Sequence, residues 1–516
     1  MALETWNGLG AQPSCESVPA DRDTPVAGSA AGPLLLRSLS RLITPVLLLA
    51  VGIFAAALLR LPIESITAHM PLNYNEGWNA FHTQRLMSGG PLYPPVSPGA
   101  FLNYPPLSFY VTGVLGKMIG DYVIAGRVLA LLSLFAVAAN VGLIVRALGV
   151  TSQLALLVSL IFLTFAVLFY GDYTATDDPQ WFGHALQTSG LLLLIRRSAP
   201  GSANILTVRT LLAVALLLAA GGLVKQDLLA LPLAVTIWLL IVDRRAFLSW
   251  LGIGAAIVVV VLAACILLYG QAFVSQVLLA ERNFSTLAFL NIVHFYAMRL
   301  IAYVAFAAVA VIVRPRDQRL WLLGIYLAFA TVVGLATMTA VGVIYSALFD
   351  MTIAMMIGAS VTTQWMGERL TGPAWRQDAG YAIAALLLVL PLRGGLEKAF
   401  DYSHQLSRGL VGAAQWDHAI KLIAAARGPV ACESLALCYW AGRTSAIDFF
   451  NFGQYVVRHP DFGRPTYAAV ADGEFGMIQM EFRGGSVRLP DVLNAAIATR
   501  YGEAQSNPTV LLTPRP

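Results

Sequence analysis

Long apolar runs recur along most of this sequence and are separated by short polar turns. The chain has 516 residues, of which 58% are hydrophobic and only 12% charged, whereas a soluble domain usually carries about 25% charged residues. Because a helix needs roughly 18–20 apolar residues to cross the hydrocarbon core of a bilayer, runs of this kind indicate membrane spans. The sequence therefore predicts an all-α polytopic membrane protein with about 11 transmembrane helices, at 42–59, 128–145, 154–169, 182–195, 211–224, 228–242, 250–269, 292–313, 320–336, 341–361 and 381–392.

Arginine marks every second turn between these runs, and Arg37 and Arg41 precede the first of them. The intervening turns near residues 175 and 340 contain no Lys or Arg. Since basic residues favour the cytoplasmic side, this alternation predicts a cytoplasmic N-terminus and an extracytoplasmic C-terminus in the cell (inner) membrane. The turns assigned to the cytoplasm carry Arg146, Arg196, Arg197, Arg209, Arg244, Arg245, Arg314, Arg316, Arg319, Arg369 and Arg376.

Composition divides the chain into three parts. Residues 1–35 are rich in Ala, Gly, Pro, Ser and Asp, which predicts a disordered cytoplasmic tail. Residues 36–392 form the transmembrane part, with a large outer loop at 61–126. Within that loop, the run 107–119 has 13 residues, too few to span a bilayer, and predicts an interfacial or re-entrant helix. Residues 393–516 predict a small extracytoplasmic α/β soluble domain, with short apolar strings at 429–431 and 467–471 as candidate strands.

The outer loop contains the longest polar and aromatic interval in the apolar part of the chain, 71–110. Residues 76–87 predict a short amphipathic helix with Trp78, Phe81 and Leu86 facing the membrane. Glu76 is the only carboxylate of this interval and the strongest candidate for a functional acid. The alternative role for Glu76 is structural, in which its negative charge stabilises the N-terminus of a helix. Further polar candidates in the interval are Asn73, Asn75, His82, Arg85 and Tyr104.

Other charged residues fall at the same predicted rim: Arg127, Asp177, Asp178, Lys225, Asp227, Glu281 and Arg282. Asp178 precedes Pro179 and could equally cap a helix. Lys225 could bind a lipid phosphate, pair with Asp227, or extend to the interface. Glu76 and Asp177 could hold a divalent cation, although no spacing requires one. His184 and His294 are expected to be structural. There is no nucleotide fingerprint and no basic stripe for nucleic acid.

Several of these segments resemble the GT-C class of polytopic glycosyltransferases, in the branch of protein O-mannosyltransferases and lipid A aminoarabinose transferases. The resemblance lies in Asn75-Glu76-Gly77-Trp78, in 86–93, in Asn103-Tyr-Pro-Pro-Leu-Ser-Phe-Tyr110, in Gly126-Arg127, in Asp177-Asp178 and in Lys225. It covers about residues 40–395. The family often has Asp-Glu at the loop motif, whereas this chain has Asn75 before Glu76.

The resemblance implies transfer of a hexosyl or pentosyl group from a polyprenyl-phosphate sugar, on the extracytoplasmic face, to a glycan, lipid or protein acceptor. Glu76 would be the general base, with Asp177 and Asp178 as further catalytic acids. Lys225 or Arg127, or a divalent metal ion as the one expected cofactor, would stabilise the leaving phosphate. Asn73, Asn75, His82, Arg85, Tyr104 and Asp227 would bind substrate. The alternatives are a lipid or sugar transporter and a polysaccharide polymerase or ligase.

Cys432 and Cys438 lie six residues apart in the predicted extracytoplasmic domain, where disulfides persist. A continuous strand would hold the two residues too far apart to be bridged, whereas a turn between them would allow a bridge. Both arrangements stay open at the level of sequence.

The alternation of arginines gives a direct test of orientation. A reporter enzyme that is active only outside the cytoplasm, fused after residue 400, should be active, because an odd number of spans places this position outside. A reporter that is active only in the cytoplasm is the matched control and should be silent at the same position. The reverse pattern would contradict the orientation.

Overall fold

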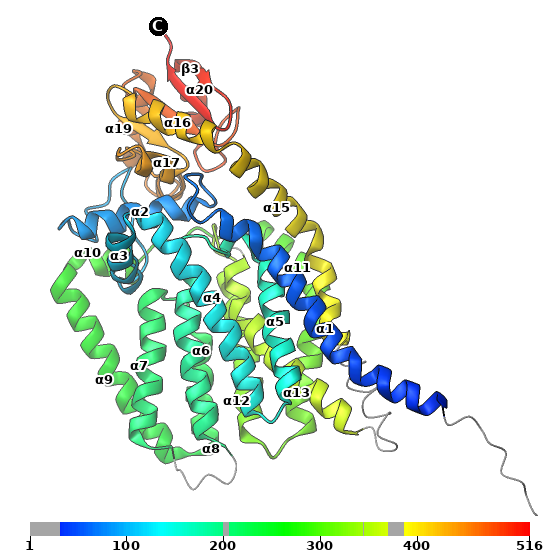
Figure 1. Cartoon of the computed structure of the whole chain (residues 1–516). Coiled ribbons are helices and arrows are strands. Elements are labelled where there is room, and N and C mark those ends of the chain that lie inside the picture. Colours follow the sequence, from blue (N-terminus) through cyan, green and yellow to red (C-terminus); the bar gives the residue numbers. More distant parts are fainter. Residues whose placement is uncertain (1–30, 200–205, 344, 370–385) are drawn as a thin grey trace, which may run out of the picture.

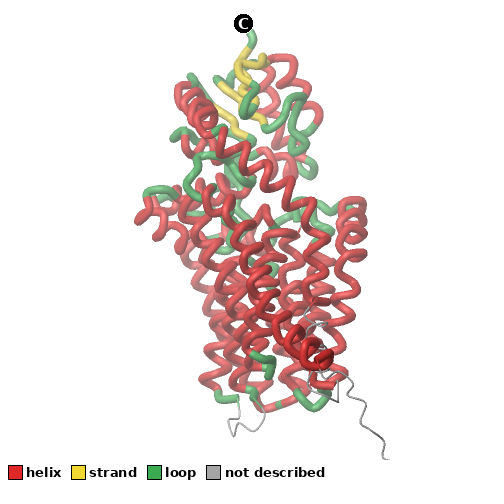
Figure 2. The backbone as a smooth tube through the Cα atoms, turned by 45° about the vertical axis from the view of Figure 1, so that its right-hand side comes forward, coloured by secondary structure: helices red, strands yellow, loops and turns green. Residues whose placement is uncertain are grey.

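The structure is a computed structural model that describes residues 31–199, 206–343, 345–369 and 386–516. A bundle of long helices carries a smaller unit, built from the C-terminal residues, on one of its ends (Figure 1). The strands are confined to that smaller unit, and the bundle is helical throughout (Figure 2). The predicted fold class, a helical membrane protein with a small C-terminal α/β unit, is confirmed.

The bundle follows the predicted apolar runs, because each run is long enough to form a helix and apolar enough to be buried or to face lipid. Its helices are α1 (Ala31–Glu64), α4 (Tyr122–Ala147), α5 (Ser152–Phe169), α6 (Gln180–Arg197), α7 (Val208–Val224), α8 (Ala230–Val242), α9 (Arg244–Tyr269), α11 (Thr286–Val313), α12 (Gln318–Thr337) and α13 (Phe349–Arg369). The largest apolar core lies between these helices.

One predicted span begins later than expected. The run 341–361 was expected to be helical from its start, but α13 begins only at Phe349, after the short helix η3 (Tyr345–Leu348). The reason is that the preceding residues pair with another segment: Val341 N donates to Asn283 O at 2.8 Å, and Phe284 forms a bridge with Ala340. This pairing ties the segment after α12 to the loop before α11.

The number of spans is not fixed by helix length. In the described residues, six helices are long and apolar enough to cross a membrane, and four apolar helices are shorter. The predicted tail 1–35 lies outside the described residues up to residue 30. Arg376, which the sequence assigns to a cytoplasmic turn together with Arg369, also lies outside them, whereas Arg369 ends α13. The last predicted span, 381–392, is described only from residue 386, where a helix leads into η4 (Leu390–Gly395).

The first outer loop contains α2 (Tyr74–Met87) and α3 (Leu107–Ile119). The prediction that α2 faces the membrane is wrong. Trp78 is buried, its Nε1 donates to Phe101 O at 2.8 Å, and its ring packs edge-on against Tyr104. Phe81 lines a small pocket beside Leu435 of the C-terminal unit, and Leu86 packs in the cluster around Trp78. The C-terminal unit covers the face of α2 that would otherwise have met lipid.

Short elements also lie at the end of the bundle that carries the C-terminal unit. These are the 3-10 turn η1 (Gly171–Tyr173) after α5, and α10 (Gln271–Phe273) with the π-helical turn η2 (Val274–Leu278) after α9. The helix α15 (Leu396–Val411) then runs along the bundle and leads from it to the C-terminal unit (Figure 1).

The C-terminal unit is a four-stranded sheet in the order β1-β2-β4-β3, packed against helices. Strands β1 and β2 are parallel, and the other two neighbouring pairs are antiparallel. Apolar clusters lie between the sheet and the helices. The elements are α16 (Ala413–Ala425), β1 (Val430–Cys432), α17 (Leu435–Trp440), α18 (Phe449–Val456), α19 (Pro460–Ala471), β2 (Met477–Met480), α20 (Asp491–Arg500), β3 (Tyr501–Gln505) and β4 (Val510–Pro514).

The two strands predicted in this unit have different outcomes. The string 429–431 overlaps β1, as predicted. The string 467–471 is the end of helix α19, so the predicted strand is wrong there. A helix forms because Pro460 starts it and the buried positions Gly463, Thr466 and Val470 recur at intervals of three and four residues, which is helical spacing. A short apolar string fits either structure when it is read alone.

Cys432 and Cys438 are joined by a disulfide, which settles the choice left open by the sequence. Cys432 ends β1 and Cys438 lies in α17, so the chain turns between them. Their Cα atoms are 5.9 Å apart, within the range that a disulfide needs. The bridge fixes α17 to the sheet at the point where α17 meets the membrane part.

The two parts of the molecule pack closely at Gly77 of α2. A Cβ atom at this position would lie 1.9 Å from Ala436 N of α17, which is a backbone atom that cannot rotate away. The Gly77→Ala protein should therefore melt at a lower temperature, because overpacking of this kind costs about 1–3 kcal/mol. The measurement is thermal unfolding of the purified full-length protein.

Gly222→Ala is the matched control, because an added Cβ would meet nothing within 4 Å in α7. Its melting temperature should be unchanged or slightly raised. Equal melting temperatures for both variants would contradict the close packing of α2 on α17.

Candidate functional site

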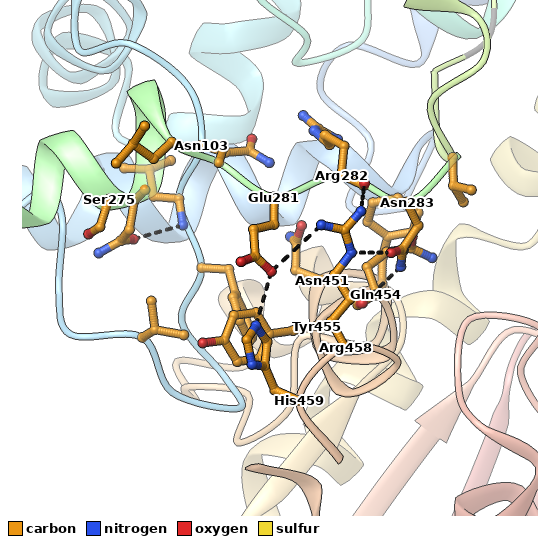
Figure 3. Close-up of a pocket in the computed structure, with 18 residues that line it drawn as sticks. Asn103, Ser275, Glu281, Arg282, Asn283, Asn451, Gln454, Tyr455, Arg458 and His459 are labelled. Atoms are coloured by element: carbon orange, nitrogen blue, oxygen red, sulfur yellow. Dashed lines mark hydrogen bonds and ion pairs between the residues drawn. The ribbon is translucent and has the colours of Figure 1, made fainter. Parts of the chain in front are cut away.

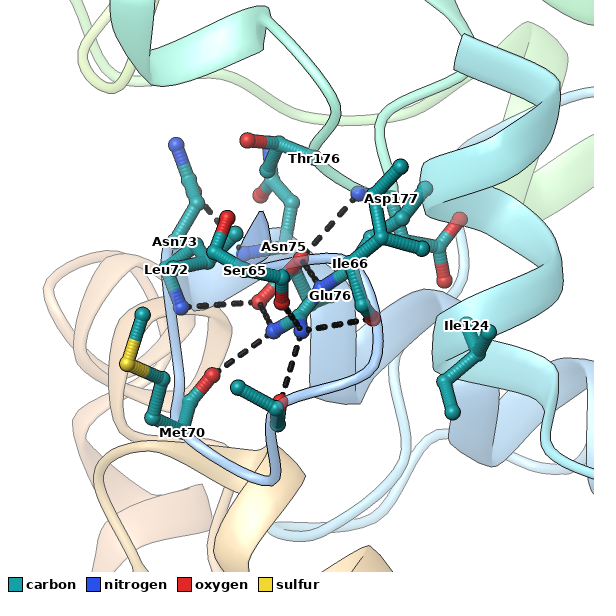
Figure 4. Close-up of polar contacts among 12 residues, drawn as sticks. Ser65, Ile66, Met70, Leu72, Asn73, Asn75, Glu76, Ile124, Thr176 and Asp177 are labelled. Atoms are coloured by element: carbon teal, nitrogen blue, oxygen red, sulfur yellow. Dashed lines mark hydrogen bonds and ion pairs between the residues drawn. The ribbon is translucent and has the colours of Figure 1, made fainter. Parts of the chain in front are cut away.

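Glu76 and Arg127 form a buried ion pair. Figure 4 shows the polar contacts around Glu76. Both side chains are fully buried. Arg127 Nε donates to Glu76 Oε1 at 2.7 Å, and Nη2 donates to Oε2 at 2.8 Å. Two parallel bonds of this kind hold a carboxylate in a fixed orientation, because the planar guanidinium matches its geometry. Glu76 sits in the first turn of α2 and Arg127 in the first turns of α4.

Arg127 also binds the segment that follows α1. Its Nη1 donates to the carbonyl oxygens of Ser65, Ile66 and Ala68, and Nη2 donates to Met70 O at 2.7 Å. The carbonyls beyond the end of a helix have no partner within that helix, and a cation is favourable there. Arg127 therefore determines where the chain turns between α1 and α2.

The remaining acceptor capacity of Glu76 is used by the backbone. Leu72 N donates to Oε2 at 2.8 Å, and Asp177 N donates to Oε1 at 3.2 Å. Each carboxylate oxygen thus accepts two hydrogen bonds. One carboxylate connects the end of α1, the start of α2, the start of α4 and the loop between α5 and α6. Glu76 has no exposed oxygen that is directed at a substrate.

Asp177 lies beside this pair in the same loop. Burial raises the pKa of Asp177 well above its usual range, and the nearby charges of Glu76 and Asp178 raise it further. Its Oδ2 is buried without a hydrogen-bond partner, and Asn79 Nδ2 donates to its backbone oxygen at 2.7 Å. Gly126 makes room for it, since a Cβ there would lie 1.9 Å from Asp177 Oδ1. These conditions favour the neutral carboxylic acid.

Glu76 and Asp177 do not fit the expected divalent cation. The oxygens of Glu76 are occupied by a guanidinium, whose positive charge would repel a metal ion, and by two backbone N–H groups. Among the residues that the structure describes, no group of three or more His, Cys, Asp or Glu side chains could hold a metal ion.

A cavity of about 520 Å³ lies at the end of the bundle that carries the C-terminal unit, next to the ion pair. Polar side chains that line it come from α2, from the loop before α3, from the residues after α7 and from the loop before α11. They include Asn75, Asn103, Tyr104, Lys225, Gln226, Asp227 and Arg282. The apolar lining includes Leu229, Phe284 and Val332, which are exposed on the surface of the bundle.

Asp178 stands directly behind the polar wall. It is 2% exposed, and its Oδ2 accepts from Asn75 Nδ2 at 2.9 Å. Its Oδ1 caps the start of α6 by accepting from Gln180 N at 2.9 Å, and lies 3.8 Å from Lys225 Nζ. The capping role considered for Asp178 is thus present, together with an ion pair. Asp178 orients two side chains that reach the cavity, Asn75 and Lys225.

The charges on the cavity wall are only partly compensated. Lys225 is paired with Asp178, and not with Asp227 as one alternative expected, and lies 5.0 Å from the centre of the Tyr104 ring. Asp227 Oδ1 is buried without a hydrogen-bond partner. The guanidinium of Arg282 has no ion-pair or hydrogen-bond partner within the described residues. The cavity therefore presents one unpaired cation, one paired cation and one free carboxylate oxygen.

The remaining candidates from the sequence lie away from this cavity. His82 is buried, and burial lowers its pKa to about 3, so the ring is neutral and Nε2 donates to Phe101 O at 2.9 Å. Arg85 Nε donates to Pro91 O at the far end of α2. Asn73 caps the start of α2, where its Oδ1 accepts from Asn75 N. His184, which was expected to be structural, is buried within the bundle, 3.6 Å from Asp350.

Residues of the C-terminal unit complete the cavity, and the sequence gives no signal for them. Phe450 and Asn451 of α18 line it together with Tyr74. The Tyr74 hydroxyl donates to Asp448, which begins α18 and whose pKa burial raises to about 7. The two partners are 374 residues apart in sequence, and no local pattern could connect them.

The ion pair predicts a stability defect. In Glu76→Gln, the buried charge of Arg127 loses its counter-charge, which typically costs about 3–5 kcal/mol. The variant should have a lower melting temperature and a lower yield of folded protein, as measured by thermal unfolding of purified protein.

Glu64→Gln is the control, since it alters an exposed pair with Arg60 in α1 and should leave the melting temperature unchanged. A Glu76→Gln protein that melts like the unmodified protein but lacks activity would contradict the structural role and support the role of base that the sequence suggested.

Comparisons with known proteins identify the fold. No protein-family model matches the chain, and no curated protein matches its sequence. Among solved structures, ArnT from Cupriavidus metallidurans bound to undecaprenyl phosphate is similar, with a TM-score of 0.57 at 14% identity, covering 90% of this chain and 97% of that one. The apo state of the same ArnT gives a TM-score of 0.55 at 14% identity, with the same coverage.

The oligosaccharyltransferase of Archaeoglobus fulgidus in the apo form gives a TM-score of 0.53 at 9% identity, covering 94% of this chain and 75% of that one. These similarities extend over nearly the whole chain, including the C-terminal unit. The chain thus has the fold of the polytopic GT-C glycosyltransferases, as the resemblance in the first outer loop implied.

Proposed function

We propose that this protein is a membrane glycosyltransferase, which moves a sugar from a polyprenyl-phosphate donor to an acceptor hydroxyl in the 520 Å³ cavity. The observation that carries the proposal is the mixed lining of this cavity. Exposed apolar side chains line it together with two cations and a carboxylate. A lipid that ends in a sugar phosphate has the same division into an apolar chain and a charged head.

The apolar wall provides the path for the lipid. Val332 of α12 is 65% exposed, and Leu229, just before α8, is 52% exposed, so both face the surroundings of the bundle. Both also line the cavity. A polyprenyl chain can therefore stay in the bilayer while its phosphate enters the polar end, which avoids burying a charge in hydrocarbon.

Lys225 and Arg282 are proposed to hold the phosphate. A phosphate develops further negative charge when its bond to the sugar breaks, and cations that are already in place stabilise that charge without reorganisation. Arg282 has no partner of its own in the described residues, and Asp178 and the Tyr104 ring hold Lys225 at the cavity wall. Arg127 does not take part, because the ion pair with Glu76 and four backbone carbonyls occupy it.

Asp227 is proposed as the general base in place of Glu76. Asp227 lines the cavity and its Oδ1 has no hydrogen-bond partner, whereas both oxygens of Glu76 are bonded, and a base needs a carboxylate oxygen that can accept a proton. The acceptor oxygen attacks the anomeric carbon, its proton passes to Asp227, and the bond from the sugar to the phosphate oxygen breaks. The electron pair leaves with the lipid phosphate. Asn75, Glu76, Asp177 and Asp178 act as positioning residues around this step.

The comparisons support this proposal at the level of fold. The ArnT structure is described with bound undecaprenyl phosphate, and the other similar structure is an oligosaccharyltransferase. We further propose that the transferred group is a single hexosyl or pentosyl unit, because a cavity of this volume suits a small ligand. The cavity is proposed to face away from the cytoplasm, since the arginine-rich turns Arg146, Arg196, Arg244 and Arg314 lie at the opposite helix ends.

Variants of the two phosphate-binding cations and a variant of the base should affect different steps of the reaction. Lys225→Met and Arg282→Met should each weaken binding of undecaprenyl phosphate about 10- to 100-fold, because a charge-assisted hydrogen bond contributes roughly 1.5–3 kcal/mol. Asp227→Asn should bind undecaprenyl phosphate normally but lower turnover by a hundredfold or more. Binding is measured on protein in lipid nanodiscs, and turnover as the release of polyprenyl phosphate from a lipid extract of the producing cells.

Asp472→Asn, on the exposed surface of the C-terminal unit, is the control and should behave like the unmodified protein. Turnover is also measured after chelation with EDTA, which tests the expected divalent cofactor directly. Normal turnover in Asp227→Asn would contradict the assignment of the base. Lipid binding without any release of polyprenyl phosphate would favour the transporter.

A further inference from the structure

A second cavity, of about 350 Å³, lies between the membrane part and the C-terminal unit. Three segments form it: residues 96–103 of the first outer loop, the segment 275–283 that follows α9, and helix α18 with the residues after it (Figure 3). Nothing in the sequence resemblance assigns this space. Its volume is at the lower end of the range of ligand pockets, about 300–1,000 Å³.

The second cavity adjoins the proposed donor cavity. Asn103, Arg282, Phe450 and Asn451 line both of them and form a shared wall. Arg282 is one of the two cations proposed to hold the donor phosphate, so a ligand in the second cavity lies next to the bond that would break. This position is the one that an acceptor has to occupy, because transfer requires the two reactants in contact.

The charges of the second cavity cancel within its walls. Glu281 lies 3.8 Å from Arg458 and 3.0 Å from His459. Arg458 Nε also donates to Asn283 Oδ1 at 2.7 Å, and Nη2 donates to Arg282 O. Once these groups are paired, Arg282 is the one unpaired charge among the described residues of the wall, and it stands at the boundary with the donor cavity. A strongly charged ligand finds no counter-charge deeper in this cavity.

Uncharged hydrogen-bonding groups without a partner remain on the same wall. Within the described residues, the side chain of Asn103, the Tyr455 hydroxyl, Gln454 Nε2 and Asn451 Oδ1 form no hydrogen bond. These groups include hydrogen-bond donors and acceptors, and the Tyr455 hydroxyl can act as either. They match the hydroxyl groups of a ligand, because each ligand hydroxyl donates one hydrogen bond and accepts others. Apolar side chains alternate with them on the wall, namely Val96, Phe101 and Leu279. Such a surface suits a neutral molecule with many hydroxyls.

We infer that the second cavity is the acceptor site and that the acceptor is a neutral saccharide. The inference rests on the proposed function and narrows its acceptor from a glycan, lipid or protein to a glycan. One exposed apolar side chain, Leu279, lines the second cavity, whereas three, Leu229, Phe284 and Val332, line the donor cavity, so the donor cavity is the better entry for a lipid. An extended peptide needs partners for its own backbone groups, whereas the free groups here are scattered side chains.

Binding of labelled probes to the full-length protein in nanodiscs tests this inference. The probes are fluorescently labelled neutral disaccharides and trisaccharides of hexoses and pentoses, labelled peptides of similar mass, and undecaprenyl phosphate. At least one saccharide should bind, and Asn103→Ala and Tyr455→Phe should each weaken its binding about 2- to 10-fold, since each removes one hydrogen bond. Tyr455→Phe should bind undecaprenyl phosphate as the unmodified protein does, because Tyr455 lines only the second cavity.

Tyr467→Phe is the matched control, because it also removes one tyrosine hydroxyl from the C-terminal unit but lies on α19, away from the cavity. It should bind the saccharide normally. Binding of undecaprenyl phosphate with no binding of any saccharide, or binding of peptides instead, would overturn the inference and leave the proposed function intact. Failure to bind undecaprenyl phosphate would instead overturn the proposed function. Saccharide binding that Tyr455→Phe and Tyr467→Phe weaken equally would overturn the assignment to this cavity.

Discussion

The arrangement of the outer face depends on one buried ion pair. Arg127 and Glu76 bind each other through two hydrogen bonds, and their remaining donors and acceptors bind the backbone of two further segments, residues 65–72 and the loop that contains Asp177. Such a pair is costly to bury, but it defines a single geometry when every donor and acceptor is satisfied. Because Glu76 is held in place, its neighbour Asn75 is directed at the cavity and at Asp178. The ion pair thus positions the first outer loop over the bundle.

The C-terminal unit closes the site from above. Helix α17 contacts α2 at Gly77, and the start of α18 binds Tyr74 through Asp448. These contacts place Phe450 and Asn451 on the wall that separates the two cavities. We propose that the first cavity receives the lipid donor and the second cavity the saccharide acceptor, with Arg282, which lines both, at their boundary.

The sequence predicts the bundle well because hydropathy is a local property, and it predicts which residues gather at the rim because arginines report topology. It does not predict their roles. Glu76 looks like a free acid until Arg127, 51 residues later, is seen to occupy it. Trp78 looks like a membrane anchor because the unit that covers it comes more than 300 residues later. The string 467–471 is apolar and short, so its helix is visible only from the residues that begin α19.

The central claim is that a lipid phosphate binds between Lys225 and Arg282. An experimental structure of the full-length protein in nanodiscs with undecaprenyl phosphate tests it most directly. The account predicts phosphate density within about 3 Å of Lys225 Nζ and of the Arg282 guanidinium, with the polyprenyl chain leaving along Val332 of α12. Phosphate density at Arg127, or at the arginine-rich opposite end of the bundle, with an empty cavity beside Lys225 would contradict it.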